Sequence, residues 1–169
     1  MAFRAAMTGH QVYSTLHTNS AIGAIPRLLD IGILPDIMAG NIIGIIAQRL
    51  VRILCPHCKY AYRPDQAELK LLASHHINHD YALSLYRAAG CELCRHHGYS
   101  GRLAIMELLK MDHDLDDLVA RRASIRDIKQ AALDRGFRPL AADGLRRVKE
   151  GLTSLSEVAR VVDLTDRMS

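Results

Sequence analysis

The sequence has few aromatic residues: its 169 residues include no tryptophan and only two phenylalanines. A core must therefore be built from aliphatic side chains, which are plentiful because hydrophobic residues make up 49% of the chain. A long apolar run is also missing. The most apolar stretch, residues 37–47, contains Asn41 and is about half as long as the roughly 20 residues that span a bilayer. We expect a buried helix there.

The N-terminal residues MAFRAAMTGHQ include no apolar leader. The absence of targeting signals favours the cytoplasm, where thiols stay reduced.

A phosphate-binding loop is missing as well. No G-x-x-x-x-G-K-[S/T] motif occurs in the chain. That loop supplies the backbone amides and the lysine that cradle ATP phosphates, and no acidic strand end offers a clear ligand for Mg²⁺. We therefore expect this chain alone neither to bind ATP tightly nor to hydrolyse it.

A strong charge excess is also absent. The formal net charge is +4, and arginines such as Arg121 and Arg146 fall on helical patterns that indicate solvated faces. The net charge does not favour a nucleic-acid partner. A nucleic-acid-binding module would be expected to have a dense basic face beside exposed aromatic residues.

The pattern of apolar residues predicts strands alternating with helices and ending in a helical tail. Strand-like segments are 10–17, 48–54 and 101–111. Helical segments, several with capping residues at their ends, are 20–33, 34–47, 65–76, 114–122, 124–136, 139–151 and 154–162. Pro26 should disturb the first of these, and Ser154 with Glu157 forms a capping box. The strand at 10–17 has too few partners for a normal sheet, which suggests that the sequence belongs to something larger.

All four cysteines fall into two Cys-x-x-Cys pairs, Cys55/Cys58 and Cys91/Cys94. Two residues between paired cysteines let a tight turn direct both sulfurs at one ion, and four thiolates suit tetrahedral zinc. Because 32 residues separate Cys58 from Cys91, a small subdomain should lie between the two loops. Such a closed site would be structural, with Lys59 and Arg95 offsetting its charge.

The spacing leaves other chemistry open. An iron–sulfur cluster also takes four cysteines, whereas disulfides are disfavoured in a reducing compartment. A thioredoxin-like pair would not explain the second motif. The nearby His57, His96 and His97 are better read as exposed loop residues than as ligands.

The segment TGHQVYSTLHTNSA, residues 8–21, places His10 and His17 at the two ends of the predicted strand. At ~3.3 Å per residue they would lie about 23 Å apart, too far to grip one small ligand together. His17, with Thr18 and Asn19, sits where a strand gives way to a helix, a place where α/β sheets bind ligands. A simple turn and helix cap explains Thr18 and Asn19 equally well.

Several segments occur in the order found in one family. TGHQVYSTLHTNSA resembles the histidine box of the ATPases of type II secretion and type IV pilus assembly (GspE/PilB). The segments that follow in that family are similar to AQRLVRILCPHCK, GCELCRHHGYSGRLAIMELL and RPLAADGLRRVKEGLTSLSEVARVV, residues 47–59, 90–109 and 138–162. The resemblance runs over nearly the whole chain.

This resemblance implies a C-terminal part of a RecA-like P-loop ATPase domain, an α/β fragment with a tetracysteine zinc-binding insertion and a helical C-terminal tail. Members are cytoplasmic homohexamers at the base of a secretion or pilus machine. They lie peripherally at the inner membrane through platform or adaptor proteins, and their hydrolysis moves pilin-like subunits. Retraction motors lack the insertion, so its presence favours the secretion and assembly branch.

Residue by residue, the resemblance assigns Cys55, Cys58, Cys91 and Cys94 to structural Zn²⁺, and His10 and His17 to the neighbourhood of the nucleotide. ATP and Mg²⁺ are expected only in the full-length parent, whose phosphate-binding loop would precede Thr8. The implied divisions are a partial ATPase core at 1–54, the tetracysteine subdomain at 55–100, and a strand with helices at 101–169.

The alternative is a free-standing tetracysteine zinc module that binds nucleic acid or protein. With either function, we expect loss of Cys91 to unfold residues 55–110 and to leave the helical tail mostly intact.

Overall fold

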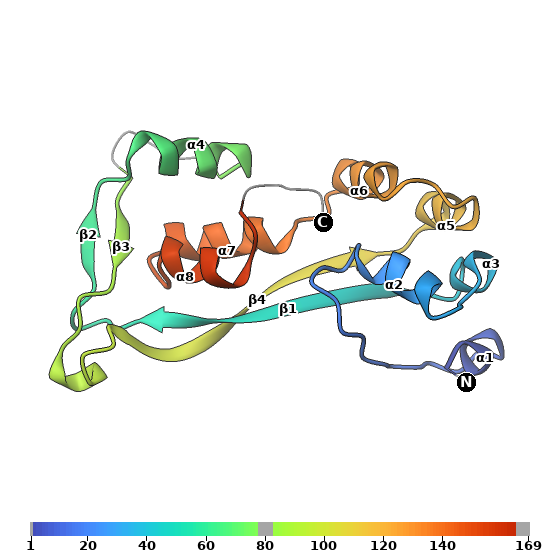
Figure 1. Cartoon of the computed structure of the whole chain (residues 1–169), viewed down its shortest axis with the longest axis horizontal. Coiled ribbons are helices and arrows are strands. Elements are labelled where there is room, and N and C mark those ends of the chain that lie inside the picture. The colour runs from blue at the N-terminus through green and yellow to red at the C-terminus, as the bar shows by residue number, and fades with distance from the viewer. Residues whose placement is uncertain (1, 78–82, 165–169) are drawn as a thin grey trace. The chain divides into compact units, whose positions relative to one another are not determined.

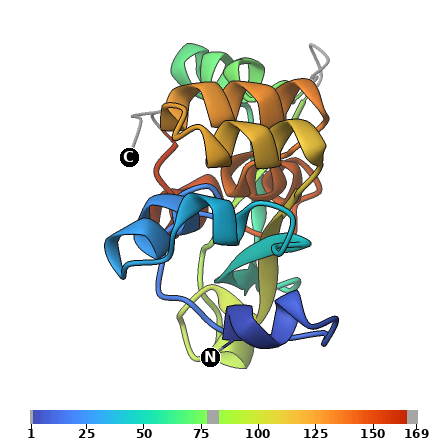
Figure 2. The same ribbon diagram turned by 90° about the vertical axis from the view of Figure 1, so that its right-hand side faces the viewer.

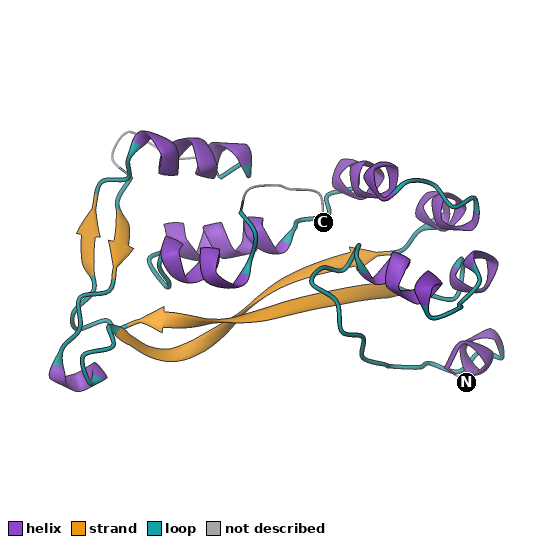
Figure 3. Cartoon of the chain, viewed as in Figure 1, coloured by secondary structure: helices purple, strands orange, loops and turns teal. Residues whose placement is uncertain are grey.

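The computed structural model describes residues 2–77 and 83–164 of the chain, which form two compact units. One unit contains the described parts of 1–47 and 107–138, and the other those of 48–106 and 139–167. Strands and helices are both present, as the α/β prediction requires (Figure 3). Within the described residues, no helix has the length and apolar character needed to cross a membrane.

Two strands, β1 (Gly44–Leu54) and β4 (Tyr99–Lys110), pair with each other. Backbone bonds at their two ends, from Met111 to Ile43 and from Cys55 to Gly98, make the pairing antiparallel. Along β4, buried Ile105 and Leu109 alternate with exposed Met106 and Leu108. This period of two shows that one face of the strand is covered by packed side chains.

The first unit is mainly helical. Its helices are α1 (Ala2–Met7), α2 (Ala24–Asp30), α3 (Pro35–Met38), α5 (His113–Ala120) and α6 (Ile125–Asp134). Helix α5 packs against both α3 and α6, and Figure 2 shows α5 and α6 side by side. The core is aliphatic, as expected from the scarcity of aromatic residues, and includes Ile25, Met38, Leu109, Leu115 and Ile128.

The second unit contains the segment between the cysteine loops and the last two helices. Short strands β2 (Tyr60–Tyr62) and β3 (Leu85–Arg87) pair antiparallel, and α4 (Gln66–Ser74) lies between them in sequence. This arrangement confirms that a small folded segment separates the loops. Helices α7 (Leu140–Lys149) and α8 (Leu155–Val161) pack together over a core that includes Val51, Leu72, Leu85, Ile105, Leu145 and Val158 (Figure 1).

The sequence prediction was wrong in its first third. Residues 10–17 form no strand and are exposed along their whole length, because no described strand pairs with them. The helix expected at 20–33 is shortened to α2. Pro26 lies in its first turn, where the missing N–H is not needed.

The helix expected at 34–47 is also wrong. It stops at Met38, residues 39–41 form a turn in which Gly40 has a φ of 73°, and β1 begins at Gly44. The four isoleucines at positions 42, 43, 45 and 46 are β-branched and favour a strand. Only the last part of the apolar run, residues 44–47, is therefore strand.

The strand expected at 48–54 ends as predicted but starts four residues earlier, at Gly44. The helix expected at 65–76, the strand expected at 101–111 and all four tail helices match the prediction within about two residues at each end. One detail at α8 differs. Ser154 accepts a hydrogen bond from the Glu157 backbone N–H, as a cap should, but the Glu157 side chain does not complete the box. It binds Arg52 and Arg160 instead.

Candidate metal centre

The first cysteine loop leaves the end of β1 as a tight turn. The Cys55 carbonyl accepts hydrogen bonds from the backbone N–H groups of Cys58, at 3.4 Å, and of Lys59, at 3.0 Å. Cys55 is itself held to the start of β4, because its N–H donates to the Gly98 carbonyl at 3.0 Å. This bond holds the first cysteine loop beside the residues that follow the second loop, so the two pairs of sulfurs lie close together.

The second loop contains the short 3₁₀ helix η1 (Glu92–Cys94), after which the His96 N–H donates back to the Cys91 carbonyl at 2.8 Å. Arg95 and His96 then adopt positive φ angles of 52° and 61°. A left-handed residue other than glycine costs roughly 1–2 kcal/mol, so this turn needs support from its surroundings.

Two glycines flank the second loop and allow the chain to pack closely. Gly90 and Gly98 have φ angles of 103° and 75°. A Cβ on Gly90 would lie 2.7 Å from the His96 carbonyl oxygen, and one on Gly98 would lie 2.5 Å from the Ala88 Cβ. Sequence reasoning missed both residues as part of the site. Their positions in the sequence could have indicated this role, because Gly90 directly precedes Cys91 and Gly98 lies four residues after Cys94.

The four cysteine sulfurs converge. All lie within 4.8 Å of one another, and no other such group of metal-binding side chains occurs in the described residues. Two pairs, Cys58 with Cys94 and Cys91 with Cys94, are 3.8 Å apart. A tetrahedron with Zn–S bonds of ~2.3 Å has sulfurs about 3.8 Å apart. The cysteines are free thiols, and these distances far exceed the ~2.05 Å of a disulfide.

Backbone N–H groups point at the sulfurs. Gly90 donates to Cys58 Sγ at 3.3 Å, and Cys91 and Gly98 each donate to Cys94 Sγ at 3.2 Å. The bond from Cys91, aided by that from Gly98, lowers the pKa of Cys94 to about 6 despite burial. Burial and the neighbouring thiols raise the pKa of Cys58 to about 11. Donors directed at sulfur suit a thiolate site, because metals bind deprotonated cysteine.

The neighbouring side chains are arranged partly as expected. His57, His96 and His97 are exposed and lie outside the sulfur cluster. Arg95 is also exposed. The Lys59 ammonium is used elsewhere, since it donates to the Gly151 carbonyl at 2.8 Å.

The two predicted histidines are not part of the cysteine site. His10 and His17 both lie in the exposed segment 10–17 of the first unit, and the His10 ring nitrogen Nδ1 is 3.1 Å from Thr8 Oγ1. Their proximity to a nucleotide stays a prediction.

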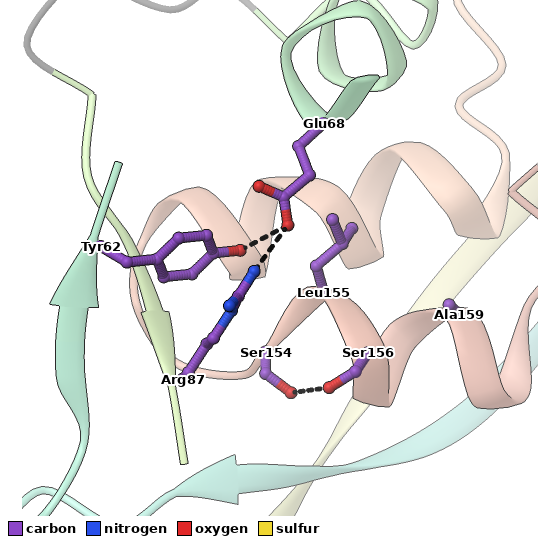
Figure 4. Close-up of a pocket in the computed structure, with 7 residues that line it drawn as sticks. All are labelled: Tyr62, Glu68, Arg87, Ser154, Leu155, Ser156 and Ala159. Atoms are coloured by element: carbon purple, nitrogen blue, oxygen red, sulfur yellow. Dashed lines mark hydrogen bonds and ion pairs between the residues drawn. The ribbon is translucent and has the colours of Figure 1, made fainter. Parts of the chain in front are cut away.

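A cavity of about 290 Å³ lies elsewhere in the second unit (Figure 4). Several of its polar groups pair with one another. Tyr62 donates to Glu68 at 2.8 Å, Arg87 reaches the same carboxylate at 3.4 Å, and Ser154 bonds Ser156 at 3.0 Å. The remaining lining comes from Leu155 and Ala159. The cavity is lined by residues of α8, α4, β2 and β3, and none of the predicted site residues lies in it.

The chain is similar to known proteins over nearly its whole length. A family model described as Type II/IV secretion system protein matches residues 1–160. The type IV pilus assembly ATPase TfpB of Acinetobacter baylyi is 43% identical over 98% of this chain, and the type II secretion system protein E of Pseudomonas aeruginosa is 45% identical over 95%. The chain spans only 28% and 31% of these two relatives.

A solved structure of the pilus retraction motor PilT with bound ADP shares the fold. It superposes with a TM-score of 0.60 over 96% of this chain and 35% of that one, at 22% identity. This likeness supports the α/β fold of the chain. The match of the family model and the two relatives confirm the family that the sequence segments indicated: the chain belongs to the type II/IV secretion system protein family.

Proposed function

We propose that this chain works as part of a longer ATPase that powers type II protein secretion or type IV pilus assembly. The observation that carries the proposal is the 43–45% identity to relatives named for those machines, over 95–98% of this chain. Catalysis would need a phosphate-binding loop, which this sequence lacks. We infer that its own contribution is structural support for a catalytic core.

Within that part, we propose that Cys55, Cys58, Cys91 and Cys94 hold one Zn²⁺. The convergence of their sulfurs and the N–H groups directed at them support a closed tetrahedral site. Zinc would supply folding energy and no chemistry, because a site with four protein ligands leaves no position for water. Iron–sulfur occupancy would give a coloured protein, so absorption spectra and elemental analysis of the purified chain distinguish the two.

We further propose that residues 10–17 become a strand in the longer ATPase. Their composition is that of a strand, and the exposed fractions of Val12, Tyr13 and Leu16 are 40%, 86% and 37%. Such a segment gains most from an adjacent strand that hydrogen-bonds its backbone. Pairing of this kind would fix His10 and His17, which we propose lie near the nucleotide.

The proposed assembly is a cytoplasmic homohexamer that meets its machine at the inner membrane through platform or adaptor proteins. Machine partners of this kind accord with the family. We propose no nucleic-acid partner. Tight, salt-dependent binding of the chain to generic DNA would contradict this and favour a zinc module of another kind.

A segment exchange tests the function. The matching segment of the Acinetobacter baylyi pilus assembly ATPase would be replaced by this chain, and pili on the cell surface would be counted. We expect pili to form, and to be lost when Cys55 and Cys91 of the exchanged segment are both changed to serine. A well-expressed hybrid that makes no pili with its cysteines intact would contradict the proposal.

A further inference from the structure

The turn between α7 and α8 is tied to two different parts of the second unit. Helix α7 ends in a Schellman motif, in which Gly151 N–H donates to the Val148 carbonyl at 2.9 Å and Leu152 N–H to the Arg147 carbonyl at 3.1 Å. Gly151 is left-handed, with a φ of 70°. Its own carbonyl points away from the helix, to a side chain far off in sequence.

That side chain is Lys59, which directly follows the first cysteine pair. Its Nζ donates to the Gly151 carbonyl at 2.8 Å and lies 4.7 Å from the centre of the Tyr86 ring. The Tyr86 ring packs so tightly on Gly151 that an added Cβ would lie 2.8 Å from it. A cation at the C-terminal end of a helix is favourable, and the ring adds a cation–π contact.

The next residues of the turn are held by a separate set of bonds from β1. Leu54 N–H donates to the Leu152 carbonyl at 2.8 Å, and Thr153 Oγ1 donates to the Arg52 carbonyl at 2.8 Å. Both anchors belong to a strand that pairs with β4. They therefore depend on the β1–β4 ribbon, whereas the Lys59 contact depends on the cysteine loop.

The position of Lys59 is set by that loop. Its N–H bonds the Cys55 carbonyl within the turn that directs the two sulfurs inward. If Cys55 and Cys58 lose a common ion, the turn keeps two backbone bonds to the Cys55 carbonyl, a long one of 3.4 Å from Cys58 N–H and one of 3.0 Å from Lys59 N–H, but loses the ion that ties it to the second cysteine loop.

We propose that the first cysteine loop is a metal-dependent latch on the α7–α8 turn, with Lys59 as its positioning residue. The inference rests on the proposed metal centre. With the ion in place, Lys59 clamps the end of α7. Without the ion the clamp opens, and α7 frays from its last turn while the anchors from Arg52 and Leu54 still hold the residues that follow.

Hydrogen exchange of the whole chain, with bound metal measured on the same samples, tests the latch. Lys59→Met keeps the length of the side chain but removes its charge. We expect this variant to bind one metal ion per chain, and its amides at 150–152 to exchange about tenfold faster, the effect of losing a charged hydrogen bond. Lys70→Met, at an exposed position on α4, is the matched control and should leave exchange at 150–152 unchanged.

Metal removal completes the test. Stripping the ion from the wild-type chain with a chelator should speed exchange at 150–152 as Lys59→Met does, and stripping it from Lys59→Met should add little there. Metal-loaded Lys59→Met with wild-type exchange at 150–152 would overturn the latch while leaving the metal centre intact. A folded chain that takes up no metal would overturn both.

Discussion

At the scale of single residues, Glu157 is a charge held in place by burial and by hydrogen bonds. Its side chain is fully buried, and burial alone would raise the pKa of its carboxyl. Hydrogen bonds from Arg160 and Arg52 outweigh burial and hold that pKa at about 2. The carboxylate also accepts the Arg52 backbone N–H at 3.0 Å, so it fastens α8 to β1.

A depressed folded pKa makes the contribution of Glu157 pH-dependent. The stabilisation is fully present above the unfolded pKa of about 4.5 and is lost as the pH falls through the folded value of about 2. We expect Glu157→Gln to reduce the free energy of unfolding by about 1–3 kcal/mol at pH 7, a value reduced because both arginines are half exposed.

Urea unfolding of the wild type and Glu157→Gln between pH 7 and pH 3 measures this effect, and the difference between the two should shrink below pH 4. The exposed Glu150→Gln, which breaks a surface pair with Arg146, should cost at most about 1 kcal/mol. A constant difference across the pH range would contradict the explanation.

A second residue-scale prediction concerns Gly98 in the metal centre. Gly98→Ala would combine a left-handed φ with a Cβ 2.5 Å from that of Ala88. We expect it to destabilise the protein by about 3 kcal/mol or more and to lower metal affinity. Gly136→Ala is the control. It has a similar φ of 85° but open space around it, so it should cost only about 1–2 kcal/mol. Thermal unfolding and metal content report both effects, and equal costs would show that crowding at Gly98 is unimportant.

At the scale of elements, close packing of α7 on α8 depends on Gly144. A Cβ at this position would lie 2.6 Å from Val158 Cγ1. Gly144→Ala gains about 1 kcal/mol of helix propensity, but we expect overpacking to outweigh it and to destabilise the protein by about 1–2 kcal/mol net. Because Val158→Ala removes the clashing methyl, the double variant should be more stable than the sum of the single changes. Strict additivity in urea unfolding would contradict this.

Some of these elements could be predicted from the sequence and others could not. The four tail helices were predictable because their ends carry local signals, such as Ser124, Ser154 and Gly151. Helix α4 has an Asp65–Glu68 capping box of the same kind, which the sequence reading overlooked. Residues 34–47 were not predictable in this way, since a largely apolar run suits a buried strand as well as a helix.

For the metal centre, the Cys-x-x-Cys spacing was sufficient to select the four sulfurs, because each pair is a local turn. The hydrogen bond from Lys59 to Gly151 joins residues 92 positions apart, so the local sequence does not predict it. The strand expected at 10–17 has the right composition but, among the described residues, no strand beside it. Composition sets what a segment can form, and its neighbours decide whether it does.

At the scale of the whole molecule, the division into units changes what loss of the metal should do. The sequence suggested that the helical tail would survive as one block. In the structure α7 and α8 belong to the unit that contains the cysteine loops, whereas α5 and α6 belong to the other. Lys59, Leu54 and Arg52 all bond to the segment that leads from α7 into α8.

We therefore expect Cys91→Ser to have a graded effect along the chain. Its loss of a sulfur ligand removes most of a binding energy that can reach about 10 kcal/mol for structural zinc, comparable to the stability of a small domain. Amide exchange should accelerate strongly across 55–98 and measurably in α7 and α8. Helices α5 and α6, with their own core around Leu115 and Ile128, should stay protected. Mass spectrometry of exchanged peptides separates the two pairs of helices. Equal protection of both pairs in the variant would show that the tail folds as one block after all, and equal loss would show that the two units unfold together.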